Sequence, residues 1–493
     1  MMGHASAWRV GRGIAVLLVA AGALSACGSG ATGATATSSA GRSPTQFTAW
    51  QAPATFRAPP DSGQIVEPVS ANPSGLAAHG YVENEYFASG KAYAFTSTST
   101  PSNGRWTFTV GTSAPYTTRI LVRRPSDPAK FDGNVMVEWM NVSAGESAPD
   151  WDYLNPGLMD SGAAYVGVSA QALGVNGGKA LLGSGSTQGL RGLQPTRYGT
   201  LHHPGDRYSL DMFAQIGRAL RVPSPSVLGG LRPSHVVAIG ESQSAFYLTT
   251  YADALQPIDH AYQGIFIHSR GGAAVPLDGQ NVTAAISGAP VRIRSDLHVP
   301  VFMLETQTDL IQLAYAGARQ PDSVGIRTWE VAGTSHADAY ELGSAASLLG
   351  CTTAVNDGPQ HLVAQAAAVA FLRWMDHGIP PPSPTPFTLT ASHPVQLILD
   401  AHGNVLGGVR TPAVDVPIST LSGAAPANSS EICGLFGSSL PFSSQTLIAL
   451  YGSKAGYLAA YSADLDQAIS GGYILAADRT ALLDQAGQVS FPS

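Results

Sequence analysis

Apolar and polar residues alternate with a period of two between residues 80 and 123. The alternation runs through four stretches separated by turn-forming residues: YVENEYF, AYAFTST, RWTFTV and TRILVRR. A period of two is typical of strands with one buried face, and short turns join antiparallel strands. We therefore predict that this part of the chain forms an antiparallel edge of a sheet.

After residue 130 the pattern changes to short runs that are apolar throughout. These runs lie at residues 135–139, 163–170, 235–240, 264–268, 299–305 and 326–333. Helical patterns occur at 207–221, directly after Ser242, and at 361–378. Strands that are apolar throughout are buried on both faces, as in a parallel sheet covered by helices. The predicted fold class is α/β, with a mostly parallel, doubly wound sheet.

Several segments do not fit this repeat. Residues 170–206 and 269–298 are long for connections in such a fold, and long connections are typical of lids and binding loops. The stiff stretch PPPSPTP leads into a C-terminal extension, residues 387–493. We predict one large, elaborated domain over residues 56–493.

The stretch HVVAIGESQSAFYLTTYADAL contains the strongest candidate for chemistry. An apolar strand ends at Gly240 and a helical pattern begins directly after Ser242. A sharp strand-to-helix turn exposes a serine at the edge of the sheet and needs small residues on both sides, here Gly240 and Ser244. Ser242 is therefore the predicted nucleophile. The alternative is that Ser242 only caps a helix.

A serine nucleophile needs a base, and the base needs an acid to orient it. In this kind of fold the acid follows a later strand and the histidine follows the last one. Asp309 follows the strand VPVFMLE, and His336 follows the strand IRTWEVAG. Glu305 is the rival acid, and a helix cap or turn carboxylate is the other interpretation of Asp309.

An acyl-transfer site also needs two donors for the oxyanion. The first expected donor is the backbone N–H of Gln243. The second is expected in the loop after VMVEW, from either Asn141 or Val142.

The N-terminus predicts export. Arg9 and Arg12 precede the apolar run IAVLLVAAGALSA, which is typical of a secretory signal. Residues 1–27 end in LSAC, which resembles a bacterial lipobox and predicts lipidation of Cys27; ordinary secretory cleavage is the alternative. The small, polar residues that follow predict a flexible tether over residues 28–55. In an oxidising compartment Cys351 and Cys433 could pair.

Composition narrows the function classes. The net charge is −7 and no block of Lys or Arg occurs, so we predict no nucleic-acid partner. The adjacent His202 and His203 lack a carboxylate at ligand spacing, so we predict no metal. No phosphate-binding or dinucleotide-binding glycine motif occurs, and we predict no cofactor. Arg270 either contacts an anionic substrate group or pairs with a carboxylate.

The chain resembles the α/β-hydrolase superfamily, and within it a bacterial group of α/β-hydrolase domain-containing proteins. The stretches that carry the resemblance are VEWMNVSAG, RYGTLHHPGDRYSLDMFAQIGRAL, AIGESQSA, HSRGG and LDAHGNVLGGVRTPAVDVP. The resemblance implies a serine-hydrolase fold with Ser242 as nucleophile, and it implies that the C-terminal extension belongs to the same unit. Ser244 departs from the glycine that is usual at its position.

These observations together predict a lipid-anchored, exported serine hydrolase that acts on a small carboxylic ester through an acyl-enzyme on Ser242. Two alternatives remain at this stage. One is a cell-envelope binding lipoprotein with the same fold and no turnover, and the other is a serine peptidase or acyltransferase.

Overall fold

The computed structural model describes residues 50–73, 75–182, 186–221, 227–279, 288–426 and 429–491. The predicted signal segment 1–27, with Cys27, and most of the predicted tether 28–55 lie outside these residues. Within the described ranges, no helix combines the length and the hydropathy needed to cross a membrane.

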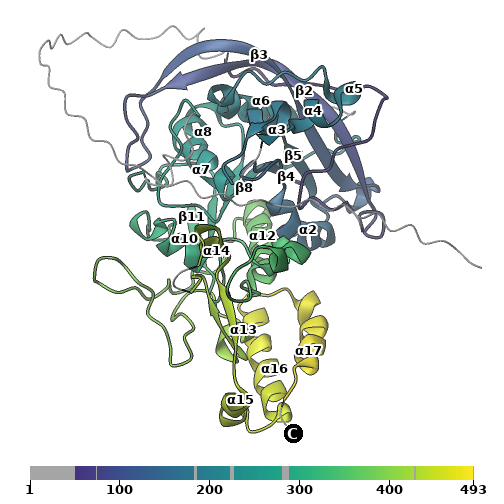
Figure 1. Cartoon of the computed structure of the whole chain (residues 1–493). Helices are drawn as coiled ribbons and strands as arrows, with labels where there is room; N and C mark the ends of the chain where they lie inside the picture. Colours follow the sequence, from purple (N-terminus) through teal and green to yellow (C-terminus); the bar gives the residue numbers. More distant parts are fainter. Residues whose placement is uncertain are drawn as a thin grey trace, which may run out of the picture.

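The centre of the molecule is a nine-stranded sheet with the order β1-β2-β3-β5-β4-β8-β9-β10-β11 (Figure 1). The last six strands in this order are parallel to one another. They are β4 (Asn134–Trp139), β5 (Ala164–Val168), β8 (His235–Glu241), β9 (Gly264–His268), β10 (Val301–Glu305) and β11 (Ile326–Glu330). Each lies within or next to a run predicted from the sequence, so the doubly wound α/β fold class is confirmed.

The N-terminal edge is antiparallel, as predicted, but its division into strands differs. Two long strands, β2 (Tyr81–Thr96) and β3 (Thr109–Pro125), replace the four predicted short ones, and β1 (Thr55–Arg57) pairs outside them. The sequence ASGKA resembles a turn, but Gly90 continues β2. A Cβ at Gly90 would lie 2.4 Å from the side-chain oxygen of Gln215, so the glycine permits a close approach rather than a turn.

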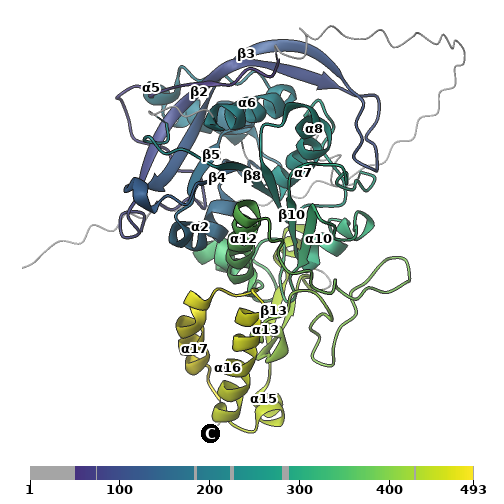
Figure 2. The same cartoon turned by 180° about the vertical axis from the view of Figure 1, so that it is seen from behind.

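Helices cover both faces of the sheet. Helix α6 (Ser209–Arg221) and helix α7 (Gln243–Thr250) pack into the larger apolar core on one face. Helix α2 (Pro149–Ser161) and helix α12 (Gln360–His377) contact each other over the second core, on the opposite face (Figure 2). Both cores form because the parallel strands are apolar on both sides.

The connections contain shorter elements. In the first long insertion these are α3 (Ala172–Asn176), β6 (Gly178–Lys179), β7 (Ser186–Thr187), α4 (Gly189–Leu193) and α5 (Pro195–Tyr198). Elsewhere they are a π-helix at Tyr251–Leu255, α8 (Gln256–Asp259), α10 (Gln307–Ile311), α11 (Ala339–Leu342) and 3₁₀ turns at Pro128–Lys130, Asp206–Tyr208, Tyr315–Gly317, Gly343–Leu348 and Ala476–Asp478.

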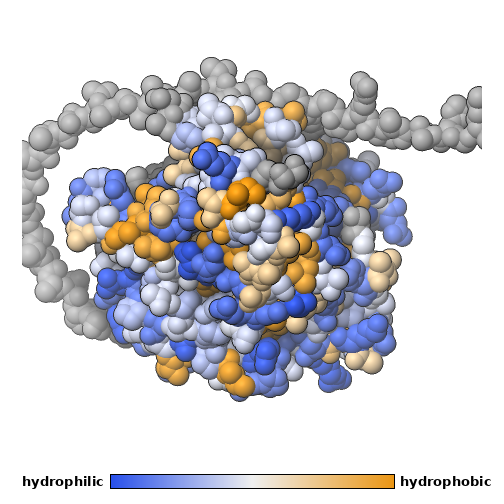
Figure 3. Space-filling model, turned by 90° about the horizontal axis from the view of Figure 1, so that it is seen from below, coloured by the Kyte–Doolittle hydropathy of each residue, from blue (hydrophilic) through white to orange (hydrophobic). Residues whose placement is uncertain are grey.

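The C-terminal segment lies at the end of the molecule opposite the β2–β3 hairpin (Figures 1 and 2). Its elements are α13 (Pro412–Asp415), β12 (Ser419–Ser422), α14 (Glu431–Phe436), β13 (Ser438–Pro441), α15 (Ser444–Tyr451), α16 (Lys454–Ser470) and α17 (Arg479–Gln488). Val409 joins it to the sheet, because its N–H donates to Glu330 and its carbonyl accepts from Ala332. Viewed from below, this end shows hydrophobic residues in small groups among hydrophilic ones (Figure 3).

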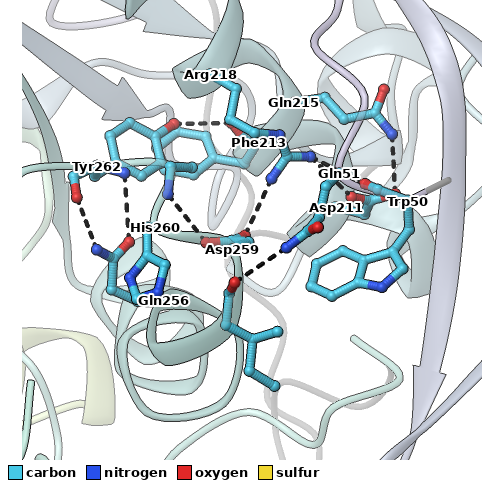
Figure 4. Close-up of polar contacts among 12 residues, drawn as sticks. Trp50, Gln51, Asp211, Phe213, Gln215, Arg218, Gln256, Asp259, His260 and Tyr262 are labelled. Carbon is cyan, nitrogen blue, oxygen red and sulfur yellow. Dashed lines mark hydrogen bonds and ion pairs between the residues drawn. The ribbon is translucent and has the colours of Figure 1, made fainter. Parts of the chain in front are cut away.

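A partly buried arginine connects the outer helices to the first described residues. Arg218 on α6 donates to Asp259 at 3.3 Å and to the carbonyl of Trp50 at 3.0 Å, and it lies 3.6 Å from Asp211 (Figure 4). The side chains of both aspartates are fully buried. Burial raises the pKa of Asp211 to about 7 and that of Asp259 to about 6, although Arg218 lowers both.

Replacing this arginine should destabilise the protein in a pH-dependent way. The folded-state pKa values of both aspartates lie above their ordinary value of 3.8. Their contribution to the free energy of unfolding is therefore fully present below pH 3.8 and is lost as the pH rises through 6 to 7. Arg218→Met removes the cation that opposes this loss. We expect a decrease of about 3 kcal/mol in the free energy of unfolding at pH 8 and a smaller one at pH 5, measured by urea denaturation.

Arg479→Met is the matched control, because Arg479 pairs with Asp466 on the exposed surface. It should leave the urea midpoint nearly unchanged. An Arg218→Met effect of the same size at both pH values would contradict the electrostatic explanation.

Candidate active site

Ser242 lies at a sharp turn between β8 and α7. Its backbone has φ 57° and ψ −119°, which non-glycine residues adopt only when the surrounding structure imposes it. The Ser242 N–H donates to the carbonyl of His268 on β9, at 3.0 Å. A Cβ at Gly240 would lie 3.0 Å from the Cβ of Ser244, so the glycine at 240 accommodates the unusual serine at 244.

A chain of hydrogen bonds connects Ser242 to Asp309. Ser242 Oγ lies 2.7 Å from His336 Nε2, and His336 Nδ1 lies 2.6 Å from Asp309 Oδ1. His336 is 6% exposed and Asp309 is fully buried. Because an imidazole that donates through Nδ1 to a carboxylate accepts through Nε2, this arrangement can take a proton from the serine hydroxyl.

Asp309 is bound at both of its oxygens. Its Oδ2 accepts from the backbone N–H and from the hydroxyl of Thr306, each at 2.7 Å, while Thr306 caps the first turn of α10. Both interpretations of Asp309 from the sequence therefore apply, since one oxygen caps a helix and the other orients His336. The pattern Thr306-x-x-Asp309 is a capping-box signature, and it could have located this helix start from the sequence.

The rival acid, Glu305, lies at the end of β10 and is fully buried. Neither of its carboxyl oxygens has a hydrogen-bond partner among the described residues. Burial raises the pKa of Glu305 well above its usual range, and Asp309 raises it further. Asp309, not Glu305, is the carboxyl group in contact with His336.

The backbone N–H groups of Asn141 and Val142, the two candidate oxyanion donors after β4, differ in how firmly they are already hydrogen-bonded. The N–H of Asn141 is occupied by the carbonyl of Ser147, at 2.9 Å. The N–H of Val142 donates at 3.1 Å to the side-chain oxygen of Gln243, which rotation of that side chain would release. The geometry therefore separates two residues that the sequence left as equals.

The loop that carries Asn141 and Val142 is held by strand β3 and by the first long insertion. Arg119 on β3 forms an ion pair with Glu146 and donates to the carbonyl of Val66 at 2.6 Å. Leu182, in the first long insertion, donates its N–H to Ser143 at 2.7 Å. The antiparallel edge and the insertion thus both position this loop.

The C-terminal segment braces the loop that carries the acid. The N–H of Gly423 donates to the side chain of Gln307 at 3.1 Å, and the carbonyl of Gly423 accepts from the hydroxyl of Thr308 at 2.6 Å. A Cβ at Gly423 would lie 2.5 Å from Gln307 Cβ and 2.9 Å from the carbonyl oxygen of Thr334. Gly423 therefore lies between the acid loop and the histidine loop.

The same segment contacts the residues after His336. The N–H of Ala337 donates to Leu435 at 3.2 Å, and the Asn356 side chain donates to Ser422 at 3.1 Å. Cys351 and Cys433 form a disulfide, with sulfurs 2.09 Å apart, which joins α14 to the chain that leaves the histidine loop.

Other residues singled out in the sequence do not reach Ser242. Arg270 is fully buried and donates to the carbonyls of Gly271 and Val291, so the structure does not place it where it could contact a substrate. His203 is buried and bonds to the carbonyl of Ala170. Among the described residues, no group of three or more His, Cys, Asp or Glu is arranged to hold a metal.

Sequence reasoning missed one residue in contact with the histidine. Glu241, at the end of β8, has its Oε1 3.7 Å from His336 Nε2. Glu241 directly precedes Ser242, but β8 ends at Glu241 and the direction of its side chain depends on the sharp turn that follows, so sequence proximity alone could not indicate this contact.

Residues 53–484 match the model of a family described as the alpha/beta hydrolase domain. The chain belongs to this family. No curated protein matches the sequence of this α/β hydrolase.

The fold is similar to solved structures with low identity. Glucuronoyl esterase from Solibacter usitatus is 10% identical with a TM-score of 0.28, over 58% of this chain and 86% of that one. Est1E from Butyrivibrio proteoclasticus is 10% identical with a TM-score of 0.29, over 53% and 95%. XC6422 from Xanthomonas campestris, an α/β serine hydrolase without a lid, is 12% identical with a TM-score of 0.27, over 50% and 86%. These likenesses are too distant to bear on the activity.

A side chain at Gly423 should disturb the Asp309–His336 contact. Gly423→Ala introduces a Cβ with no room beside Gln307 and Thr334, so the two loops must separate. We expect a loss of about 2 kcal/mol in unfolding free energy and a slower reaction of Ser242 with a fluorophosphonate, by about tenfold.

Gly487→Ala is the control, since a Cβ at Gly487 on α17 meets no atom within 4 Å. Thermal unfolding and labelling rates would be measured for both variants. Parent-like labelling of Gly423→Ala would show that the C-terminal segment does not position the acid and histidine loops.

Proposed function

We propose that this α/β hydrolase is a serine hydrolase that cleaves carboxylic esters through an acyl-enzyme on Ser242. The observation that carries the proposal is the continuous hydrogen-bonded chain from Ser242 through His336 to Asp309, with distances of 2.7 and 2.6 Å. The strained backbone of Ser242 supports it further, because strain at a serine that faces a histidine is typical of a nucleophile.

In the proposed mechanism Ser242 Oγ attacks the ester carbonyl while His336 Nε2 takes the hydroxyl proton. Asp309 keeps the imidazole in the tautomer that accepts at Nε2 and stabilises its charged form. His336 then gives the proton to the leaving alcohol, and the acyl group remains on Ser242. Water, activated by His336 in turn, attacks the acyl-enzyme and releases the acid and free Ser242.

The proposed oxyanion donors are the backbone N–H groups of Gln243 and Val142. Gln243 begins α7, so its N–H belongs to the helix start beside Ser242. The substrate oxygen would replace the side-chain oxygen of Gln243 on the Val142 N–H. A donor of this kind contributes about 3 kcal/mol to transition-state stabilisation.

Ser242→Ala should abolish covalent labelling. The full chain is treated with a fluorophosphonate and followed by intact mass, with hydrolysis of short-chain 4-nitrophenyl esters measured in parallel. We expect one adduct in the parent protein, none in the variant, and about a 10⁶-fold loss in kcat. No adduct in a folded parent protein would overturn the proposal and favour a binding lipoprotein.

A pair of acid variants provides the matched control for the triad. Asp309→Asn should lower kcat by about 10⁴-fold, because the imidazole then favours the wrong tautomer. Glu305→Gln should leave kcat close to that of the parent, since Glu305 does not contact His336. A larger effect at Glu305 would reassign the acid. A peptidase or acyltransferase would label equally and differ only in the preferred substrate or acceptor.

We also propose that the chain is exported and anchored to the cell membrane by a lipid on Cys27. The proposal rests on the sequence LSAC after an apolar signal and on the disulfide between Cys351 and Cys433, since disulfides are typical of oxidising compartments.

Cys27→Ser should release the protein from the membrane. We expect the parent in the detergent-soluble membrane fraction of a bacterial host and the variant in the soluble exported fraction, detected by immunoblot. A parent protein found without detergent in the soluble fraction would favour ordinary secretory cleavage.

A further inference from the structure

We propose that Glu241 is a positioning residue for His336, because its carboxyl group lies between the ring nitrogen that takes the Ser242 proton and the side-chain amide of Asn141. The inference rests on the proposed function, because it assigns His336 as the base. It concerns a buried acid that the triad itself does not use.

Glu241 connects the oxyanion loop to the histidine. The side-chain amide of Asn141 donates to the backbone carbonyl of Glu241 at 3.3 Å and to its Oε2 at 3.4 Å. The other carboxyl oxygen, Oε1, lies 3.7 Å from His336 Nε2. Glu241 is 3% exposed, so packing restricts its side chain.

The hydrogen bonds indicate which oxygen carries the acid proton. An amide N–H can only donate, so Oε2 accepts from Asn141. The proton of a neutral Glu241 therefore belongs on Oε1, which faces the imidazole. At 3.7 Å the carboxyl does not form a hydrogen bond with Nε2, and it does not compete with the Ser242 hydroxyl for that nitrogen.

The surroundings of Glu241 disfavour a negative charge. Burial raises its pKa well above the usual range, and neighbouring carboxyl groups raise it further. The titratable groups that face it from the packed elements are Glu138 on β4, Asp150 on α2, Asp309 on α10, Glu341 on α11, Tyr153 on α2 and His336 itself. His336 is the basic group within 4 Å of Glu241 among the described residues.

The interactions of this acid cluster are directed away from Glu241. Asp150 accepts from His268 Nδ1 at 2.9 Å, and His268 Nε2 in turn accepts from Gln360 at 3.2 Å. Glu138 accepts from Tyr165 at 2.7 Å and from two backbone N–H groups at the start of α2. These donors contact Asp150 and Glu138 rather than Glu241.

A neutral Glu241 preserves His336 as a base. A carboxylate at this distance would stabilise the imidazolium before substrate binds, and a protonated histidine cannot take the serine proton. The neutral carboxyl group of Glu241 instead lies between the His336 ring and the Asn141 amide, and it fixes the position of the base relative to the oxyanion loop.

The decisive experiment compares three substitutions at Glu241 in the full chain. Glu241→Gln keeps the shape and neutrality of the protonated acid, so kcat should stay within about threefold of the parent. Glu241→Asp withdraws the carboxyl from the ring, and Glu241→Met removes the hydrogen bond to Asn141. Both should lower kcat by about tenfold with little change in KM, because the base is displaced.

The pH dependence tests whether Glu241 carries a charge, whereas the recovery of kcat in Glu241→Gln but not in Glu241→Asp or Glu241→Met tests its positioning role. The acidic limb of kcat/KM reports the ionisation of the essential base in the free enzyme. It should be the same in the parent and in Glu241→Gln. If Glu241 were charged, replacing it with the neutral glutamine would shift this limb to lower pH.

Glu305 offers a matched control, because it is also a buried strand-end acid and forms no ion pair or hydrogen bond with His336, which pairs with Asp309 instead. Glu305→Gln and Glu305→Met should keep the parent kcat. Loss of kcat in Glu241→Gln, or parent kcat in Glu241→Asp or Glu241→Met, would overturn the proposal. Failure of fluorophosphonate to label the parent would instead overturn the proposed function, so the two failures are distinguishable.

Discussion

Burial of carboxyl groups at the carboxyl edge of the sheet is the constraint on which this site depends. A buried acid must either receive hydrogen bonds to its charged form or give up the charge. Asp309 receives them at both oxygens, from Thr306 and His336. Glu305, four residues earlier, receives none from the described residues, and burial raises its pKa. The difference in donors, not in position along the chain, separates the acid that orients the histidine from its neighbour.

The loops that carry Asp309, His336 and the oxyanion donors are held in place by contacts from distant parts of the chain. Gly423, more than a hundred residues after Asp309, contacts both the acid loop and the histidine loop. Arg119, on the antiparallel edge, holds the loop after β4 through Glu146. The parallel strands bring Ser242, Asp309 and His336 to one edge of the sheet. They do not by themselves fix the distances between these side chains to within a few tenths of an ångström. The peripheral segments supply that precision, as positioned sites generally require.

The agreement between sequence and structure follows from periodicity and chain order. Short runs that are apolar throughout favour strands of a covered sheet, and parallel strands end at one edge, so residues that follow these strands, such as Ser242, Asp309 and His336, are expected to lie near one another. The errors have equally physical causes. Gly90 resembled a turn because sequence does not distinguish a glycine needed for a bend from one needed for close packing. For Arg270 the sequence left substrate contact and pairing with a carboxylate open, because it does not reveal that the side chain is buried and donates to backbone carbonyls.

The sequence by itself determined the fold class, and it predicted that Ser242, Asp309 and His336 follow separate strands, with Glu305 as a rival acid, because these features depend on local periodicity and on residue types at strand ends. Only the tertiary structure decided which of Asn141 and Val142 has an N–H that can be released, and which carboxyl contacts the imidazole. It also decided that Glu241 faces His336. These outcomes depend on which donors approach an acceptor in three dimensions, and donors from residues far apart in the chain leave no pattern in the sequence.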